Sequence, residues 1–398
     1  MSALKETADA ALSSTGPQAA LAAETLSPGL TLNTKPLFKL MVEKKASDLF
    51  FTANAPIKIK IEGQILPVNK QVLTPETVRQ TAFALMTSEQ REHFQREWEL
   101  DFAVSEPGLG RFRVNVFMQR GYPAMVMRYI TADMPRLDSL GLPSVITDLV
   151  LMRRGLLLMV GATGSGKSTT LAAMINYRNE NASDHIVTIE DPIEFLHTNK
   201  RSIVNQREVG LDTKSYSRAL RGVVRAAPDV ILIGEIRDTE TMEHAIAFAE
   251  TGHLCLGTLH SNSANQTIDR IINFFSEERR KQLLMDLSSN LKAIISQRLI
   301  RTEDGRGRRA AMEILINTPI IADKLLKGEF HEIKEIMQKS RELGMMTFDV
   351  SLFELYDEGA IAYDEAIRNA DSANELRLNV KLHSKRGVPA PALQVAAG

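Results

Sequence analysis

The chain has 398 residues, which is too long for one compact core and favours two domains flanked by tails. Its hydrophobic fraction of 44% and charged fraction of 24% are ordinary for a globular protein, and its formal net charge of −1 gives no overall basic field for nucleic acid. The single cysteine, Cys255, excludes a disulfide framework and a cysteine-based zinc site within one chain. With no signal-peptide pattern and no run near the roughly 18 apolar residues of a membrane helix, we expect a cytoplasmic protein without direct membrane insertion.

The first part of the chain predicts a tail followed by an α+β domain. Residues 1–33 are rich in small and polar side chains and lack periodicity, which predicts disorder. Apolar residues at helical spacing from Pro36 to Lys45 predict a helix, and Thr74-Pro75-Glu76 marks the start of another. Strands are predicted over 48–52, 57–61, 65–68, 100–104, 110–119 and 122–130. We therefore expect a domain over 34–132 with an antiparallel sheet and helices on one face.

The rest of the chain predicts a parallel α/β domain. Breakers over 133–143 indicate a linker, and strands alternate with helices from residue 144 onward. After about Asn290 the strand signals thin out, so a helical C-terminal region is expected up to residue 378. Residues 379–398 are predicted to form a second disordered tail.

A phosphate-binding loop lies at the start of this second domain. The apolar run Leu156–Val160 predicts a buried strand, and a helix is predicted from Thr169. Between them the loop sequence matches G-x-x-x-x-G-K-[ST] with Gly161, Ala162, Thr163, Gly164, Ser165, Gly166, Lys167 and Ser168. Glycines let backbone N–H groups face phosphates, Lys167 reaches the β- and γ-phosphates, and Ser168 places a hydroxyl on Mg²⁺. Thr169 follows at the start of the helix, so the motif predicts binding of ATP with Mg²⁺.

Acidic residues follow two further buried strands. Glu235 comes after Val230–Ile233, where a neighbouring parallel strand would place it near Mg²⁺ and the attacking water. We expect it to orient or deprotonate that water and to contact the metal. Glu190 and Asp191 follow another strand and face the same cleft, which makes Glu190 a second catalytic candidate. Arg237 is an equally good structural partner for Asp191 or Glu190.

Two histidines flank a third strand edge. His253 and His260 either sense the γ-phosphate, link neighbouring subunits, or make structural hydrogen bonds, and the residue pattern leaves these roles open. His260 is retained as a catalytic candidate. No acid pattern around them indicates a metal site.

Together these segments resemble the secretion ATPase superfamily, over nearly all of residues 36–380. The P-loop looks like its Walker A box, 186–194 (IVTIEDPIE) like its Asp box, 234–238 (GEIRD) like its Walker B box and 251–260 (TGHLCLGTLH) like its His box. Within the superfamily the chain looks most like the pilus retraction branch, PilT and PilU, because of 205–209 (NQREV), 219–228 (ALRGVVRAAP) and 285–299. Assembly ATPases of the family carry a four-cysteine zinc module, which a chain with one cysteine cannot build.

The resemblance is closer to PilU than to PilT. At 319–324 the chain reads PIIADK, a poor match to the AIRAVA-type motif of PilT, and Phe50 replaces a histidine of the PilT-like SDLHL. The ending IRNADSANELRL at 367–378 and the longer C-terminus also look like PilU. This implies an ATPase acting alongside a PilT-like partner in type IV pilus retraction and twitching motility, at the periphery of the inner membrane through the pilus machine.

The resemblance also implies an architecture. A PAS-like N-terminal domain would precede a RecA-like ATPase domain, in a homo-hexameric ring that engages an inner-membrane platform protein (PilC-like). Arginines of the first domain would complete the nucleotide site, and the segments that look like theirs contain Arg111, Arg113 and Arg120. Guanidinium groups neutralise charge that develops in phosphoryl transfer. The alternative is that each arginine only pairs with acids on the domain surface.

Two other functions remain compatible with the residues alone. RecA-like sheets also drive nucleic-acid motors, although the neutral charge argues for no nucleic-acid partner. A nucleotide-binding coupling subunit with little motor activity of its own is the second alternative, and the intact Lys167 and Glu235 argue against it.

Overall fold

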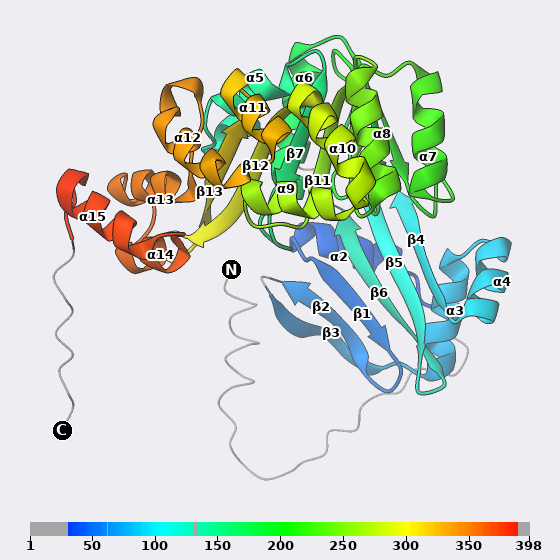
Figure 1. The fold of residues 1–398 in the computed structure, drawn as a ribbon. Coiled ribbons are helices and arrows are strands. Elements are labelled where there is room, and N and C mark those ends of the chain that lie inside the picture. Colours follow the sequence, from blue (N-terminus) through cyan, green and yellow to red (C-terminus); the bar gives the residue numbers. More distant parts are fainter. Residues whose placement is uncertain (1–30, 62, 131–133, 389–398) are drawn as a thin grey trace, which may run out of the picture. The chain divides into compact units, whose positions relative to one another are not determined.

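The computed structural model describes residues 31–61, 63–130 and 134–388, which divide into two compact units, Met1–Ile130 and Thr131–Gly398 (Figure 1). The division lies close to the domain boundary expected at residue 132. Most of the tail expected over 1–33, part of the expected linker, and 389–398 lie outside the described residues. In the described part of the chain, no helix combines the length and the apolarity that a membrane crossing requires.

Unit 1 is built on one antiparallel sheet of six strands in the order β3-β2-β1-β6-β5-β4. Alternation along the strands buries one side of the sheet: on β5, Phe112, Val114 and Val116 are fully buried while the residues between them are half-exposed. The strands are β1 Asp48–Thr52, β2 Pro56–Ile61, β3 Gln64–Val72, β4 Glu99–Glu106, β5 Gly110–Gln119 and β6 Tyr122–Ile130. All six predicted strands are present, with β3 and β4 longer than expected.

Helices α2 Lys35–Glu43, α3 Pro75–Leu85 and α4 Ser88–Glu97 share the core of this sheet. Phe38 of α2 stacks on Phe112 of β5 with ring centroids 4.1 Å apart. The predicted cap of α3 is confirmed, since the Thr74 side chain accepts a hydrogen bond from the Thr77 backbone N–H. Helix α4 was not predicted, because Phe94 is its only buried residue and gives no periodic apolar signal.

Unit 2 is built on a sheet of seven strands in the order β13-β12-β7-β11-β10-β8-β9 (Figure 1). All neighbours run parallel except β12 and β13. The strands are β7 Gly155–Val160, β8 His185–Glu190, β9 Ile203–Glu208, β10 Val230–Ile233, β11 Leu254–Leu259, β12 Leu291–Arg301 and β13 Arg308–Ile316. The central strands β7, β10 and β11 are buried along their whole length, which explains their continuous apolar sequences.

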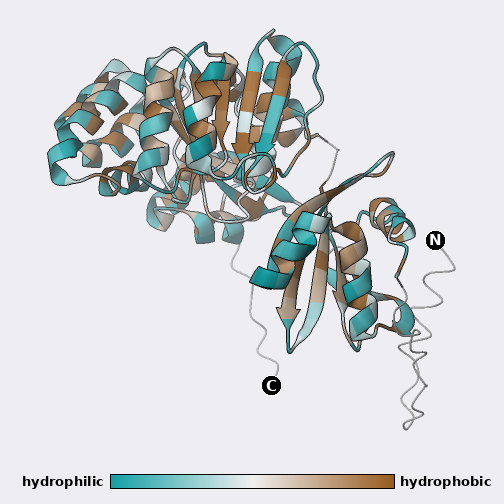
Figure 2. Cartoon of the chain, turned by 90° about the vertical axis from the view of Figure 1, so that its right-hand side faces the viewer, coloured by the Kyte–Doolittle hydropathy of each residue, from teal (hydrophilic) through white to brown (hydrophobic). Residues whose placement is uncertain are grey.

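Two cores cover the two faces of this sheet. Leu156, Leu158 and Val160 of β7 join one core, and Leu157 and Met159 join the other, as strand alternation requires. One core contains residues of α5 Val145–Val150 and α6 Lys167–Asn181. The other contains residues of α7 Tyr216–Val223, α8 Thr239–Glu250, α9 Ala264–Asn273, α10 Glu277–Asn290, α11 Pro319–Lys327 and α12 Ile333–Lys339. Helices of both units carry hydrophilic as well as hydrophobic residues, as expected for elements with one face on a core (Figure 2).

The region after Asn290 differs from the expectation of helices alone. The long strands β12 and β13 come first and pair with each other in antiparallel register. Helices α13 Phe348–Asp357, α14 Tyr363–Asn369 and α15 Ala373–His383 then form a small separate core together with Ile300 of β12 and Ala311 of β13. The tail predicted from residue 379 is wrong up to His383, because Leu376 and Val380 are one turn apart on α15 and both are buried.

Part of the predicted linker also belongs to a core. A short 3₁₀ helix, Leu137–Leu140, places Leu137 in the core that contains α5 and α6. The Pro- and Gly-containing segment that indicated a linker therefore contains an ordered turn of helix that leads into α5.

Candidate functional site

The P-loop connects β7 to α6 and needs its glycines for two reasons. Gly164 and Gly166 have φ angles of +78° and +89°, a region that residues with a Cβ rarely adopt. A Cβ at Gly161 would lie 2.4 Å from Ser165 Oγ, and one at Gly166 would lie 2.6 Å from Gln297 Nε2. The loop thus needs glycine at some positions because the backbone is left-handed there, and at others because no space is left for a Cβ.

The N-terminus of α6 is prepared for an anion. Its N-cap is Gly166, no side chain caps it, and its first turn holds no acidic residue. The first backbone N–H groups and the positive end of the helix dipole are therefore available to a phosphate.

Lys167 lies on this loop with its side chain buried. Its Nζ donates hydrogen bonds to the backbone oxygens of Gly161 at 2.7 Å and Ala162 at 3.0 Å. Burial lowers the pKa of Lys167 below its ordinary value, and the charge of Glu235 partly offsets this. The ammonium group has no close carboxylate partner among its hydrogen bonds, so it is suited to meet a negatively charged ligand.

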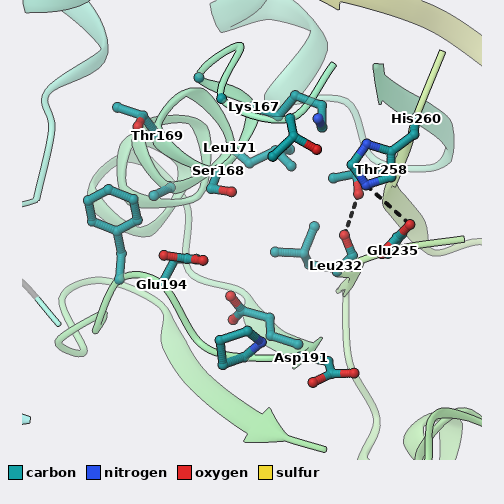
Figure 3. Close-up of a pocket in the computed structure, with 18 of the residues that line it drawn as sticks. Lys167, Ser168, Thr169, Leu171, Asp191, Glu194, Leu232, Glu235, Thr258 and His260 are labelled. Atoms are coloured by element: carbon teal, nitrogen blue, oxygen red, sulfur yellow. Dashed lines mark hydrogen bonds and ion pairs between the residues drawn. The ribbon is translucent and has the colours of Figure 1, made fainter. Parts of the chain in front are cut away.

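Glu235 follows β10, and Figure 3 shows it facing His260. Arg237 Nε donates to its Oε2 at 2.7 Å, and His260 Nε2 lies 3.2 Å from its Oε1. The parallel register of β10 and β11 pairs Ile233 with Gly257, which brings the ends of the two strands together. Glu235 and His260, which were predicted from separate sequence boxes, are therefore direct neighbours in the site.

The acids after β8 have different partners. Glu190 Oε1 accepts hydrogen bonds from Thr188 Oγ1 at 2.6 Å and from Gln206 Nε2 at 3.2 Å. Burial raises the pKa of Glu190, although these hydrogen bonds oppose the rise. Arg237 Nη1 lies 3.9 Å from Asp191 Oδ2, so of its two expected partners it meets Asp191.

These side chains surround one cavity of about 530 Å³ (Figure 3). The predicted residues that line it are Thr163, Gly164, Gly166, Lys167, Ser168, Thr169, Glu190, Asp191, Glu235 and His260. Three predicted loop residues do not line this cavity, since Gly161, Ala162 and Ser165 line a smaller one of about 280 Å³ instead.

The predicted arginines lie in unit 1. Arg111 and Arg113 are on the face of β5 opposite its buried phenylalanine and valines, as the alternation predicted. Arg113 Nε lies 3.4 Å from Asp101 Oδ1 of β4, and both side chains are partly exposed. Arg120 sits at the turn between β5 and β6 with a φ of +49°. Their role toward a nucleotide stays a prediction.

The two predicted histidines separate in the structure. His253 Nδ1 lies 3.0 Å from Phe248 O and 3.0 Å from Thr251 Oγ1, and it does not line the cavity. These contacts fit the structural role considered for His253, whereas His260 lies in the site.

Several lining residues were not predicted. Phe195 and His197 follow the Asp box, and burial lowers the pKa of His197 to about 4, so its ring is neutral near pH 7. Tyr216 lines the cavity from α7, and burial raises its pKa. None of them stands in a motif with its own chemistry, which is why only the assembled cavity reveals them.

Comparisons with known proteins agree with this geometry. Residues 26–346 match the model of the family described as type II/IV secretion system protein. The chain is 54% identical over 349 residues to the type IV pilus ATPase PilU of Pseudomonas aeruginosa, covering 88% of this chain and 91% of that protein. It is 42% identical over 318 residues to a twitching motility protein of Neisseria gonorrhoeae, covering 80% and 85%.

A solved structure extends the likeness to the fold. The pilus retraction motor PilT with bound ADP superposes with a TM-score of 0.81 and 41% identity, covering 86% of this chain and 98% of that one. The matches favour neither the nucleic-acid motor nor the passive coupling subunit. With the family model covering most of its length and these relatives matching across both units, the chain belongs to the type II/IV secretion system protein family.

Proposed function

We propose that the chain is an ATPase of the type IV pilus machine, whose hydrolysis of ATP powers pilus retraction and twitching motility in a homo-hexameric ring. One observation carries this proposal: Lys167 on the P-loop and the Glu235–His260 pair line the same cavity. The identity of 54% to PilU supports the place of this ATPase in retraction.

The residues around the cavity divide the chemistry between them. The N-terminus of α6 and Lys167 would bind the phosphates. Glu235, fixed by Arg237 and facing His260, would orient and deprotonate the attacking water. Because Arg237 bridges from Glu235 toward Asp191, it would keep the carboxylate in place while ligands exchange.

Mg²⁺ fits this donor set. Among residues 31–61, 63–130 and 134–388, no three His, Cys, Asp or Glu side chains gather to hold a metal ion. Mg²⁺ commonly takes one or two protein oxygens and completes its shell with water and phosphate. The exposed Ser168 hydroxyl and Glu235 would hold it, and the ion would neutralise phosphate charge.

The architecture implied by the family fits the two units. For unit 1 a PAS-like domain is supported by the central pair β1 and β6 and by the insertion of α3 and α4 between β3 and β4. For unit 2 a RecA-like domain is supported by the parallel sheet with the P-loop after β7.

The resemblance to PilU makes the chain an accessory that works with a PilT-like ATPase and the PilC-like platform protein at the inner membrane. Deleting its gene is therefore expected to reduce twitching, and the wild-type gene is expected to restore it only when the PilT-like ATPase is present. Twitching-zone diameter measures both effects. Restoration without the PilT-like ATPase would show an independent motor, and no effect of the deletion would contradict the proposed function.

The arginines of unit 1 are proposed to neutralise phosphate charge during turnover. Arg113→Ala is expected to lower kcat by about 10²-fold, at the lower end of the loss typical for removing one group that stabilises developing charge. Phosphate release measures this, with Arg79→Ala as control because Arg79 lies on α3 beside Glu76 on the surface. Unchanged kcat in Arg113→Ala would mean that Arg113 serves only its ion pair with Asp101.

A further inference from the structure

Gln297 of β12 stands out because it belongs to none of the motif boxes and yet contacts the P-loop at several points. Its side chain is 2% exposed. The parallel register pairs Ser296 with Val160, the last residue of β7, so Gln297 lies level with the first residue of the loop. A residue distant in sequence therefore packs directly against the P-loop.

Both ends of the Gln297 amide are used. Nε2 donates to the backbone oxygen of Ser165 at 2.8 Å, and Oε1 accepts from Thr170 Oγ1 at 2.8 Å. A backbone oxygen can only accept, whereas a hydroxyl can donate, so this orientation of the amide is the one that satisfies both partners. Both hydrogen bonds are buried, so losing either would leave a polar group without a hydrogen-bond partner in a place that water does not reach.

The bond to Ser165 sets the direction of the next N–H group. Among the described residues the only cis peptide is Asp191-Pro192, so the Ser165–Gly166 peptide is trans. In a planar trans peptide the C=O and N–H point in opposite directions. With the Ser165 oxygen held toward Gln297, the Gly166 N–H points away from β12.

The cavities agree with this direction. Ser165 and Gln297 line the smaller cavity, whereas Gly166 lines the larger cavity with Lys167 and Glu235. The backbones of β12 and the P-loop are also in close contact, because a Cβ added at Gly161 would lie only 2.6 Å from the Gln297 backbone oxygen.

We propose that Gln297 is a positioning residue that aims the Gly166 N–H at the phosphates of the bound nucleotide. This rests on the proposed function, since it concerns the same ATP site. Without the Nε2 donor, the Ser165 oxygen loses its partner in a buried place, and rotation of the peptide would turn an acceptor toward the phosphates. P-loop N–H groups cradle the α- and β-phosphates, which ATP and ADP share. The effect therefore falls on binding of both nucleotides.

Gln297→Met keeps the length of the side chain and removes both hydrogen bonds, while Gln297→Glu keeps the acceptor for Thr170 and removes the donor to Ser165. Each is expected to raise the Kd for ADP and the KM for ATP by about tenfold or more, the factor expected from one ordinary hydrogen bond. Since the lost contact is common to ground and transition states, kcat changes much less than KM. Calorimetric titration of the full chain with Mg-ADP and steady-state turnover measure these values.

Ser296→Ala is the matched control. Ser296 is the adjacent residue on β12 and equally buried, but its hydroxyl lies 3.4 Å from Glu313 and not on the P-loop. We expect its nucleotide affinity and KM to stay at the wild-type values. A KM effect in Ser296→Ala as large as that of Gln297→Met would overturn the assignment, because it would reflect general damage to β12.

Thr170 provides a second route if Gln297→Met does not fold. Thr170→Val removes the hydroxyl that donates to the Gln297 amide, and it is expected to raise the Kd for ADP. Thr170→Ser keeps this hydroxyl, and its Kd for ADP is expected to match that of the wild type. Wild-type affinity in Thr170→Val and Gln297→Glu would overturn the role of Gln297 while leaving the ATPase intact. A wild-type chain that neither binds nor hydrolyses nucleotide would instead contradict the proposed function.

Discussion

Lys167→Ala is expected to lower kcat for ATP hydrolysis by about 10²–10³-fold or more, the loss typical for removing a group that stabilises developing negative charge. Its Nζ lies over the loop carbonyls of Gly161 and Ala162, in the cavity that also holds Glu235. In the proposed mechanism, this buried charge would exchange the backbone oxygens for phosphate oxygens when a nucleotide binds. A phosphate-release assay at saturating ATP measures the effect, and the same variant is expected to fail to restore twitching.

The stability of this variant separates a chemical defect from misfolding. Burial lowers the pKa of Lys167 in the folded chain, so below its unfolded pKa the charged side chain opposes folding. Without nucleotide, Lys167→Ala is therefore expected to unfold at a midpoint no lower than that of the wild type near pH 7. Lys200→Ala is a suitable control, because Lys200 pairs with Glu180 and lies outside the cavity lining. Retained ATP turnover in Lys167→Ala would contradict the assignment of the site.

Much of this site was predictable because its determinants are local. The P-loop combines a wholly apolar strand, glycines at left-handed positions and a helix start within a few residues, and each feature is visible in the sequence. Strand ends also predicted that Glu190 and Glu235 would face the same place, since parallel strands end at one edge of a sheet.

The rest depends on register between distant strands. Nothing local to Gln297 indicates that β12 lies beside β7. The buried residues of β12 and β13 run consecutively and do not alternate, so the sequence over 291–316 lacks the period-2 signal of a strand. Likewise, Arg298 is the next residue on β12 and meets Asp371 at 3.0 Å and the Phe348 ring at 3.8 Å, in the helical region that follows. Such pairings join segments separated by whole helices, so only the folded chain reveals them.

Glu235→Gln is expected to lower kcat by about 10²–10⁴-fold, the usual contribution of a general base, while ATP still binds. The amide keeps the size of the side chain and loses the carboxylate that Arg237 holds and His260 faces. Removing a negative charge near the phosphates favours ATP binding, whereas losing the carboxylate proposed to face Mg²⁺ opposes it, so the Kd for Mg-ATP is expected to stay close to the wild-type value. Single-turnover phosphate release and nucleotide titration of the same protein measure the two effects separately.

Glu190→Gln is the comparison that decides between the two predicted acids. Burial raises the pKa of Glu190, which by itself makes its carboxylate more basic. Its Oε1, however, already accepts hydrogen bonds from Thr188 and Gln206, and we therefore expect it to be less free than Glu235 to take a proton from the attacking water. The loss of kcat is therefore expected to be smaller in Glu190→Gln than in Glu235→Gln. Glu250→Gln, at the far end of α8 beside Asn290, controls for surface charge and is expected to match the wild type. A larger loss in Glu190→Gln would move the role of base to β8, because the attacking water would then have to lie beside Thr188 and Gln206.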